Sequence, residues 1–79
     1  MLGEEEAKVV EVRPFDLHGV GYRDVTIAYK DRSVDHARLG PEGVPENLQP
    51  GEIVLATRVA NMLVSLRRPD PAPTPEKEG

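Results

Sequence analysis

A repeated rhythm of short apolar runs and turn residues decides which folds are open to this chain. Five runs rich in Val, Ile, Leu and Ala are separated by Gly, Pro, Asn and Asp, which is the pattern of consecutive β-strands. The predicted strands span residues 7–15, 22–30, 33–39, 52–59 and 62–68. No segment carries a helix-period apolar stripe longer than one turn. The sequence therefore predicts an all-β domain.

Alternation within two of these runs predicts which side chains face the core. Residues 22–30 show the clearest alternation, with Val25, Ile27 and Tyr29 on one face. In the last run, the same reasoning places Met62, Val64 and Leu66 on the inner face. The first run contains Pro14, which we expect to end its strand because proline donates no ladder hydrogen bond.

The third run breaks this alternation. Val34 is out of phase with Ala37 and Leu39. A one-residue slip of this kind is typical of a β-bulge, which also bends the strand. The sequence therefore predicts a bulge near Asp35 and His36.

Five short strands are too few for a two-layer sandwich, but they can close on themselves and remove their exposed edges. We expect a small five-stranded β-barrel, of the oligonucleotide/oligosaccharide-binding (OB) kind or of the SH3-like kind. The connection at 40–51 contains three prolines and three glycines, which exclude a strand there. Pro45 is suited to the first position of a single helical turn ending at Leu48, between the third and fourth strands.

The charge is divided unevenly along the chain. Of a net charge of −4, residues 1–6 contribute three glutamates, and residues 70–79 combine acidic residues with repeated prolines. Residues 7–69 hold nine basic and eight acidic side chains. We therefore expect a flexible acidic N-terminus at 1–6, a barrel domain at 7–69 and a disordered Pro-rich acidic tail at 70–79.

The residues that usually carry catalysis or bind metals are scarce. The chain has no cysteine and only two histidines, His18 and His36, which argues against disulfide, thiol and Cys-zinc chemistry. Asp35 and His36 are strand neighbours, so their side chains are expected on opposite faces, too far apart for an acid–base pair. We expect a protein that is not an enzyme, with no catalytic residues, metal site or cofactor. The acidic start and the absence of a long apolar run predict a cytoplasmic protein without membrane contact.

Residues 43–68, GVPENLQPGEIVLATRVANMLVSLRR, follow the closing pattern of many small barrels. This pattern is a Pro-rich turn, a PG(D/E)xV sequence, a strand, a tight turn and an apolar final strand. It is similar to the OB-like barrels of hydrogenase-maturation chaperones and of the interdomain region of proteasome-associated AAA ATPases. The resemblance implies a fold and no activity, because those chaperones rely on an N-terminal cysteine motif and this chain has no cysteine.

Protein binding is the function that the sequence favours. Small barrels with near-neutral, mixed-charge surfaces suit protein interfaces. Leu63 and Val54 are off-face apolar positions of the last two strands and are expected to form a shared exposed patch. An edge strand interrupted by Pro14 offers a second route, pairing with a partner strand or with a second copy of the chain.

Binding of single-stranded DNA or RNA is the alternative function. OB barrels bind single strands with basic side chains along the phosphates and aromatic rings under the bases. Arg58, Arg67 and Arg68 flank the final hairpin and are expected to form one basic patch, with Tyr22 as a stacking residue. The aromatic content of 4% is low for this role.

Overall fold

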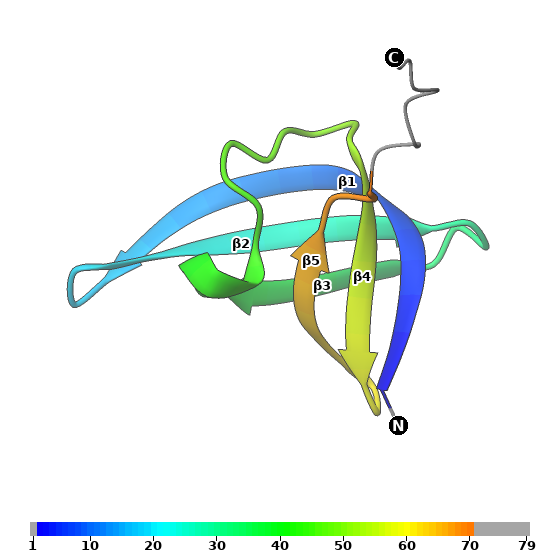
Figure 1. Cartoon of the computed structure of the whole chain (residues 1–79). Helices are drawn as coiled ribbons and strands as arrows, with labels where there is room; N and C mark the ends of the chain where they lie inside the picture. The colour runs from blue at the N-terminus through cyan, green and yellow to red at the C-terminus, as the bar shows by residue number, and fades with distance from the viewer. Residues whose placement is uncertain (1, 71–79) are drawn as a thin grey trace, which may run out of the picture.

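The structure, a computed structural model, describes residues 2–70 and consists of one antiparallel sheet of five strands (Figure 1). Its elements are β1 (Leu2–Leu17), β2 (Val20–Tyr29), β3 (Val34–Leu39), the 3-10 turn η1 (Pro41–Gly43), β4 (Ile53–Val59) and β5 (Met62–Arg67). The strand order is β3-β2-β1-β4-β5, so β1 is central and β3 and β5 are the edge strands. These edge strands approach each other across the core. The prediction of an all-β fold with five strands is confirmed.

The central strand β1 is long because its two halves pair with different neighbours. The first half pairs with β4 from Leu2 to Lys8, and the strand pairs with β2 from Ala7 to Leu17. The register with β2 shifts between Val9 and Glu11, and a bulge of this kind bends a strand. Figure 1 shows β1 as an arch over the rest of the sheet.

Two predictions for this strand are wrong. Residues 2–6 are not a flexible segment: Glu4, Glu5 and Glu6 pair with β4 inside the sheet. Pro14 does not end β1, which continues to Leu17. The proline lies beyond the residues paired with β4, so one edge of the strand is open there, and an open edge tolerates a missing N–H. Of the predicted tail at 70–79, residues 71–79 lie outside the described residues.

The core lies between the inward-facing rows of the strands. Val25, Ile27 and Tyr29 are all buried, as their alternation predicted. Val9 and Val54 are also almost fully buried. The remaining buried apolar side chains are Ala7, Leu39, Leu48, Ala56, Leu63 and Leu66.

The last strand does not follow the predicted alternation. Leu63 and Leu66 are buried, whereas Met62 and Val64 are exposed, so the inward placement of Met62 and Val64 was wrong. The register explains this: Thr57 pairs with Ser65 and Arg58 pairs with Leu63, which leaves Val64 as an extra residue. Such a bulge shifts the inward phase by one position.

The bulge predicted in the third strand is absent. Residues Val34 to Leu39 pair with Ala28 to Arg23 without a register shift. Val34 is out of phase with Ala37 and Leu39 because it faces outward, where it is exposed. An isolated exposed valine needs no distortion of the strand.

The connection between β3 and β4 is anchored to the bulged part of β1. The amide of Gly51 donates to the carbonyl of Val9 (2.7 Å), and the amide of Val9 donates to Glu52 (2.8 Å). Its helical turn is at Pro41–Gly43 rather than at the predicted 45–48. Asn47 has a positive φ of 57°, a conformation that a right-handed turn does not contain.

Two-residue turns join β1 to β2 and β4 to β5. His18 and Gly19 both have positive φ, 50° and 79°, as the type I′ turn requires. In the β4–β5 turn the positive φ falls on Ala60 (56°). The neighbouring Asn61 does not take this conformation, although asparagine tolerates the left-handed region better than alanine.

Candidate functional site

The distal part of the β1–β2 hairpin projects from the rest of the sheet as a two-stranded arm. The edge strand β3 reaches only to Leu39, which pairs with Arg23 of β2. Residues 15–17 and 20–22 therefore pair only with each other, and together with Pro14 and the turn they form the arm (14–22). Figure 1 shows this hairpin extending to the left of the core, and the molecule has a longest dimension of 48 Å.

One face of the arm carries only apolar and aromatic side chains. Phe15 pairs directly with Tyr22, and Leu17 pairs with Val20. Directly opposed residues share a face, as do residues two apart along a strand. Leu17 and Val20 are 43% and 39% exposed, and the two aromatic side chains are half-buried. We call these four residues the apolar arm face.

The opposite face of the arm is charged. Asp16 pairs with Gly21, and Pro14 pairs with Arg23. A Cβ placed on Gly21 would lie 3.6 Å from both Asp16 Oδ1 and Arg23 Nη1, so these two charged side chains flank the glycine. The arm is therefore amphipathic.

Paired charges surround the base of the apolar arm face. The Arg38 guanidinium lies 3.7 Å from the centre of the Phe15 ring and donates to both carboxylate oxygens of Asp24, at 2.7 and 3.1 Å. The hydrogen bond from Arg38 holds the pKa of Asp24 below its ordinary value. Beside them, Arg13 pairs with Glu11 at 2.7 Å.

A shallow hollow adjoins this base on the outer face of β1, β2 and β3. Its volume is ≈ 370 Å³. Thr26 and His36 meet there, with 2.9 Å between Thr26 Oγ1 and His36 Nδ1. The remaining lining residues are Glu11, Arg13, Asp24, Val25, Ala37 and Arg38.

A second polar cluster lies at the opposite end of the sheet, where Arg58 continues the inward row of Val54 and Ala56 on β4. Its Nε lies 3.7 Å from Asp35 Oδ2, and its guanidinium carbon is 5.5 Å from the centre of the Tyr29 ring. Tyr29 donates its hydroxyl hydrogen to the same oxygen of Asp35 (2.9 Å). Burial, reinforced by the Asp35 carboxylate, raises the pKa of Tyr29 to about 12.

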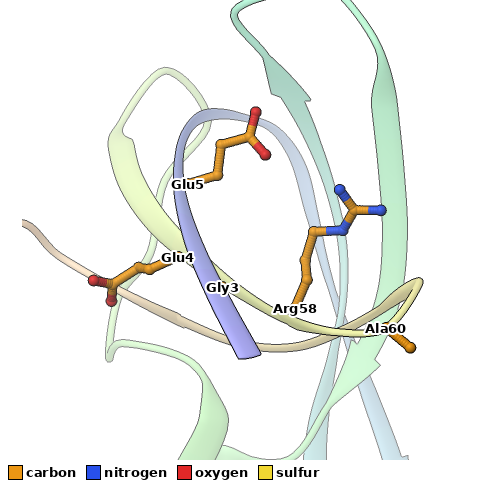
Figure 2. Close-up of a pocket in the computed structure, with 5 residues that line it drawn as sticks. All are labelled: Gly3, Glu4, Glu5, Arg58 and Ala60. Carbon is orange, nitrogen blue, oxygen red and sulfur yellow. The ribbon is translucent and has the colours of Figure 1, made fainter. Parts of the chain in front are cut away.

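The cavity next to Arg58 is formed by residues of β1 and the β4–β5 turn. Its volume is ≈ 290 Å³, and Gly3, Glu4, Glu5 and Ala60 complete its lining. Figure 2 shows the Glu4 side chain directed away from Arg58, in line with its bond to Arg67. The Nε of Arg58 is buried and, within residues 2–70, has no hydrogen-bond acceptor. Only that atom is enclosed, because the Arg58 side chain as a whole is 35% exposed.

The three predicted basic residues do not form one patch. Arg58 faces inward, toward Asp35. Arg67 binds Glu4 through two hydrogen bonds, at 2.7 and 3.1 Å, and Arg68 binds the separate carboxylate of Glu52, at 2.8 and 3.2 Å.

The apolar residues predicted to bind a partner also lie elsewhere than expected. Leu63 and Val54 are both buried, so the predicted exposed patch is wrong. Tyr22 does lie on an accessible surface, the apolar arm face, next to three residues that were not selected from the sequence: Phe15, Leu17 and Val20. Their signal was alternation on both sides of the His-Gly turn, in FDL and VGY.

Comparison with family models, curated proteins and solved structures finds no match to this chain. Within residues 2–70, no three His, Cys, Asp or Glu side chains are grouped so that they could hold a metal ion. The same part of the chain contains no helix with the length and apolar character needed to cross a membrane.

Proposed function

We propose that this protein is a non-enzymatic, cytoplasmic protein-binding module and that the arm is its binding surface. The amphipathic character of the arm carries this proposal: four apolar or aromatic side chains share one face, and charged side chains occupy the other. A two-stranded hairpin alone is marginally stable in water and is stabilised when its apolar face is buried. A partner that covers this face supplies that burial.

The surroundings of the apolar arm face fit a protein interface. Protein interfaces have an apolar or aromatic centre and a polar rim. Here the rim charges are already neutralised, because Arg38 binds Asp24 and Arg13 binds Glu11. Docking a protein on this face therefore leaves no charge without its partner.

Single-stranded nucleic acid is the second candidate, favoured by the Arg38 guanidinium stacked on Phe15, since bases also stack on such platforms. The charge of the folded body argues against it. Once the three glutamates at 4–6 belong to the sheet, residues 2–69 hold nine basic and eleven acidic side chains, a net charge of −2. A body with this charge gains little from counterion release on a phosphate backbone.

We also propose that the sheet closes in the manner of an OB barrel. Three observations support this: β1 is shared between β2 and β4, β3 approaches β5, and a 3-10 turn follows β3 at the place of the OB helix. Slow hydrogen exchange is expected at the outer-edge amides of β3 and β5 by NMR. Exchange there as fast as in the turns would show an open sheet.

Site-specific photo-crosslinking tests the binding surface. A benzophenone amino acid placed at Leu17, on the apolar arm face, is expected to give one discrete protein adduct in cells that produce the protein. The same group at Asp16, on the charged face, is the matched control and is expected to give none. Val20→Asp, added to the Leu17 probe, is expected to lower the adduct yield at least about tenfold, because it places a charge in the centre of the apolar face.

The other outcomes contradict the proposal. Equal adducts from Leu17 and Asp16 would mean that the arm has no preferred binding face. An adduct containing nucleic acid would move the second candidate into first place. No adduct from either position would remove the arm as a binding surface.

A further inference from the structure

The cavity next to Arg58 is opened by a glycine. Gly3 of β1 pairs directly with Arg58 of β4, and directly opposed residues share one face of a sheet. A Cβ placed on Gly3 would meet no atom within 4 Å, so this glycine leaves open space beside the arginine. The space belongs to the cavity of ≈ 290 Å³, a volume near the small end of the range for ligand pockets.

The Arg58 guanidinium is held by one long ion pair and by no hydrogen bond within residues 2–70. Its partner, Asp35 Oδ2, is 3.7 Å away and already accepts from the Tyr29 hydroxyl, while Asp35 Oδ1 accepts from the amide of His36 (3.0 Å). Other arginines each donate to a carboxylate at 2.7 or 2.8 Å: Arg13, Arg38, Arg67 and Arg68. Arg58 therefore keeps donors for a further acceptor, and the acceptor that best fits a guanidinium is a carboxylate.

Of the three glutamates at the start of β1, Glu5 borders this cavity with its charge. Glu4 pairs with Arg67 and Glu6 pairs with Lys30, whereas Glu5 is exposed and has no cationic partner within residues 2–70. Figure 2 shows its carboxylate and the guanidinium bordering the same opening. The cavity therefore presents a positive and a negative group that are not paired with each other.

We infer that this cavity binds a small zwitterion of amino-acid size, with its carboxylate on Arg58 and its ammonium group on Glu5. The charges disfavour simpler ligands. Asp35 and Glu5 together outweigh the one positive charge of Arg58, so a lone anion meets an excess of negative charge, and a lone cation meets the guanidinium. A zwitterion brings one group of each sign and matches both. The cavity is at the opposite end of the sheet from the arm, so this binding activity is separate from the proposed protein binding.

An NMR titration of the full chain tests the site. The probes are glycine, β-alanine and 4-aminobutyrate, which hold their two charges progressively further apart. At least one of them is expected to shift the amides of Gly3 and Ala60 and the Nε–H signal of Arg58 in a saturable manner. The expected Kd is about 1–10 mM, because ligands this small make few contacts. Propionate and propylammonium each carry only one of the two charges and are expected to bind at least about tenfold more weakly.

Two substitutions and a control test the named residues. Gly3→Val extends a side chain into the open space and is expected to raise the Kd at least about tenfold, with no decrease in the urea midpoint. Glu5→Gln removes the charge that binds the ammonium group and is expected to weaken zwitterion binding to the level of propionate. Glu6→Gln is the matched control, because Glu6 is the neighbouring glutamate but does not line the cavity. It is expected to leave the Kd unchanged.

Three results would overturn the inference. The first is the absence of a saturable shift with all three zwitterions up to about 100 mM. The second is binding that neither Gly3→Val nor Glu5→Gln weakens, which would place the ligand elsewhere. The third is propionate binding as tight as that of the zwitterions, which would mean that Arg58 forms an anion site only.

Discussion

Leu63→Asp is expected to unfold the protein, whereas Met62→Asp, one residue away, leaves it folded. Leu63 is 7% exposed and Met62 is 68% exposed, the reverse of the placement predicted from the sequence. An ionised carboxylate buried without a partner costs more than about 4 kcal/mol. A domain of this size has a free energy of unfolding of only about 3–5 kcal/mol. Circular dichroism with urea titration measures both variants.

This pair of variants also tests the bulge at Val64. The bulge is what turns Leu63 inward and Met62 outward. With regular alternation through β5, the two results would be exchanged: Met62→Asp would unfold the chain and Leu63→Asp would be tolerated. A folded Leu63→Asp protein with a near-normal urea midpoint would contradict the register described here.

Stability is expected to fall as the pH rises from about 10 to about 12, because of Tyr29. The folded state raises the pKa of this phenol from an ordinary value of 10.0 to about 12. The unfolded chain therefore loses the phenolic proton first, and ionisation favours unfolding across this interval. The contribution of this pKa shift to the free energy of unfolding is fully present below pH 10. Its loss is worth about 2–3 kcal/mol, since one pKa unit corresponds to about 1.4 kcal/mol.

Tyr29→Phe is the control for this effect. It removes the hydroxyl bond to Asp35 and is expected to cost about 1 kcal/mol at neutral pH. Between pH 10 and 12, however, its urea midpoint is expected to fall less than that of the unmodified chain. Parallel decreases in the two proteins would show that the phenol of Tyr29 does not control alkaline stability.

The strand positions and most of the core were predictable because they depend on local patterns. Val25, Ile27 and Tyr29 alternate without interruption, and all three are buried. The predicted alternation was wrong in the last strand, because Val64 is an extra residue there. This bulge left no mark in the order of apolar residues, because Met62, Leu63 and Val64 are all apolar. Met62 and Leu63 were therefore assigned to the wrong faces. The sequence predicts that a strand exists more reliably than it predicts which side faces the core.

Partners distant in the sequence account for two further errors. Glu4, Glu5 and Glu6 have low β-propensity and resemble a solvated end, yet their pairing with β4 places them in the sheet. The predicted basic patch failed for the same reason, because Arg67 pairs with Glu4 and Arg68 pairs with Glu52. The arm itself was visible only as alternation on either side of a turn. What made it a candidate site was the early end of β3, which a single sequence does not show.

The division of β1 between two neighbours has a consequence for the growing chain during synthesis. Its second half pairs with β2, which follows immediately, but Leu2 to Lys8 pair with Val59 to Ile53. The ribosome must therefore release β4 before the first half of β1 has a partner. In the meantime an unpaired strand edge would be open to other chains. The three consecutive glutamates at 4–6 place like charges on that edge, and charge of this kind opposes association between chains.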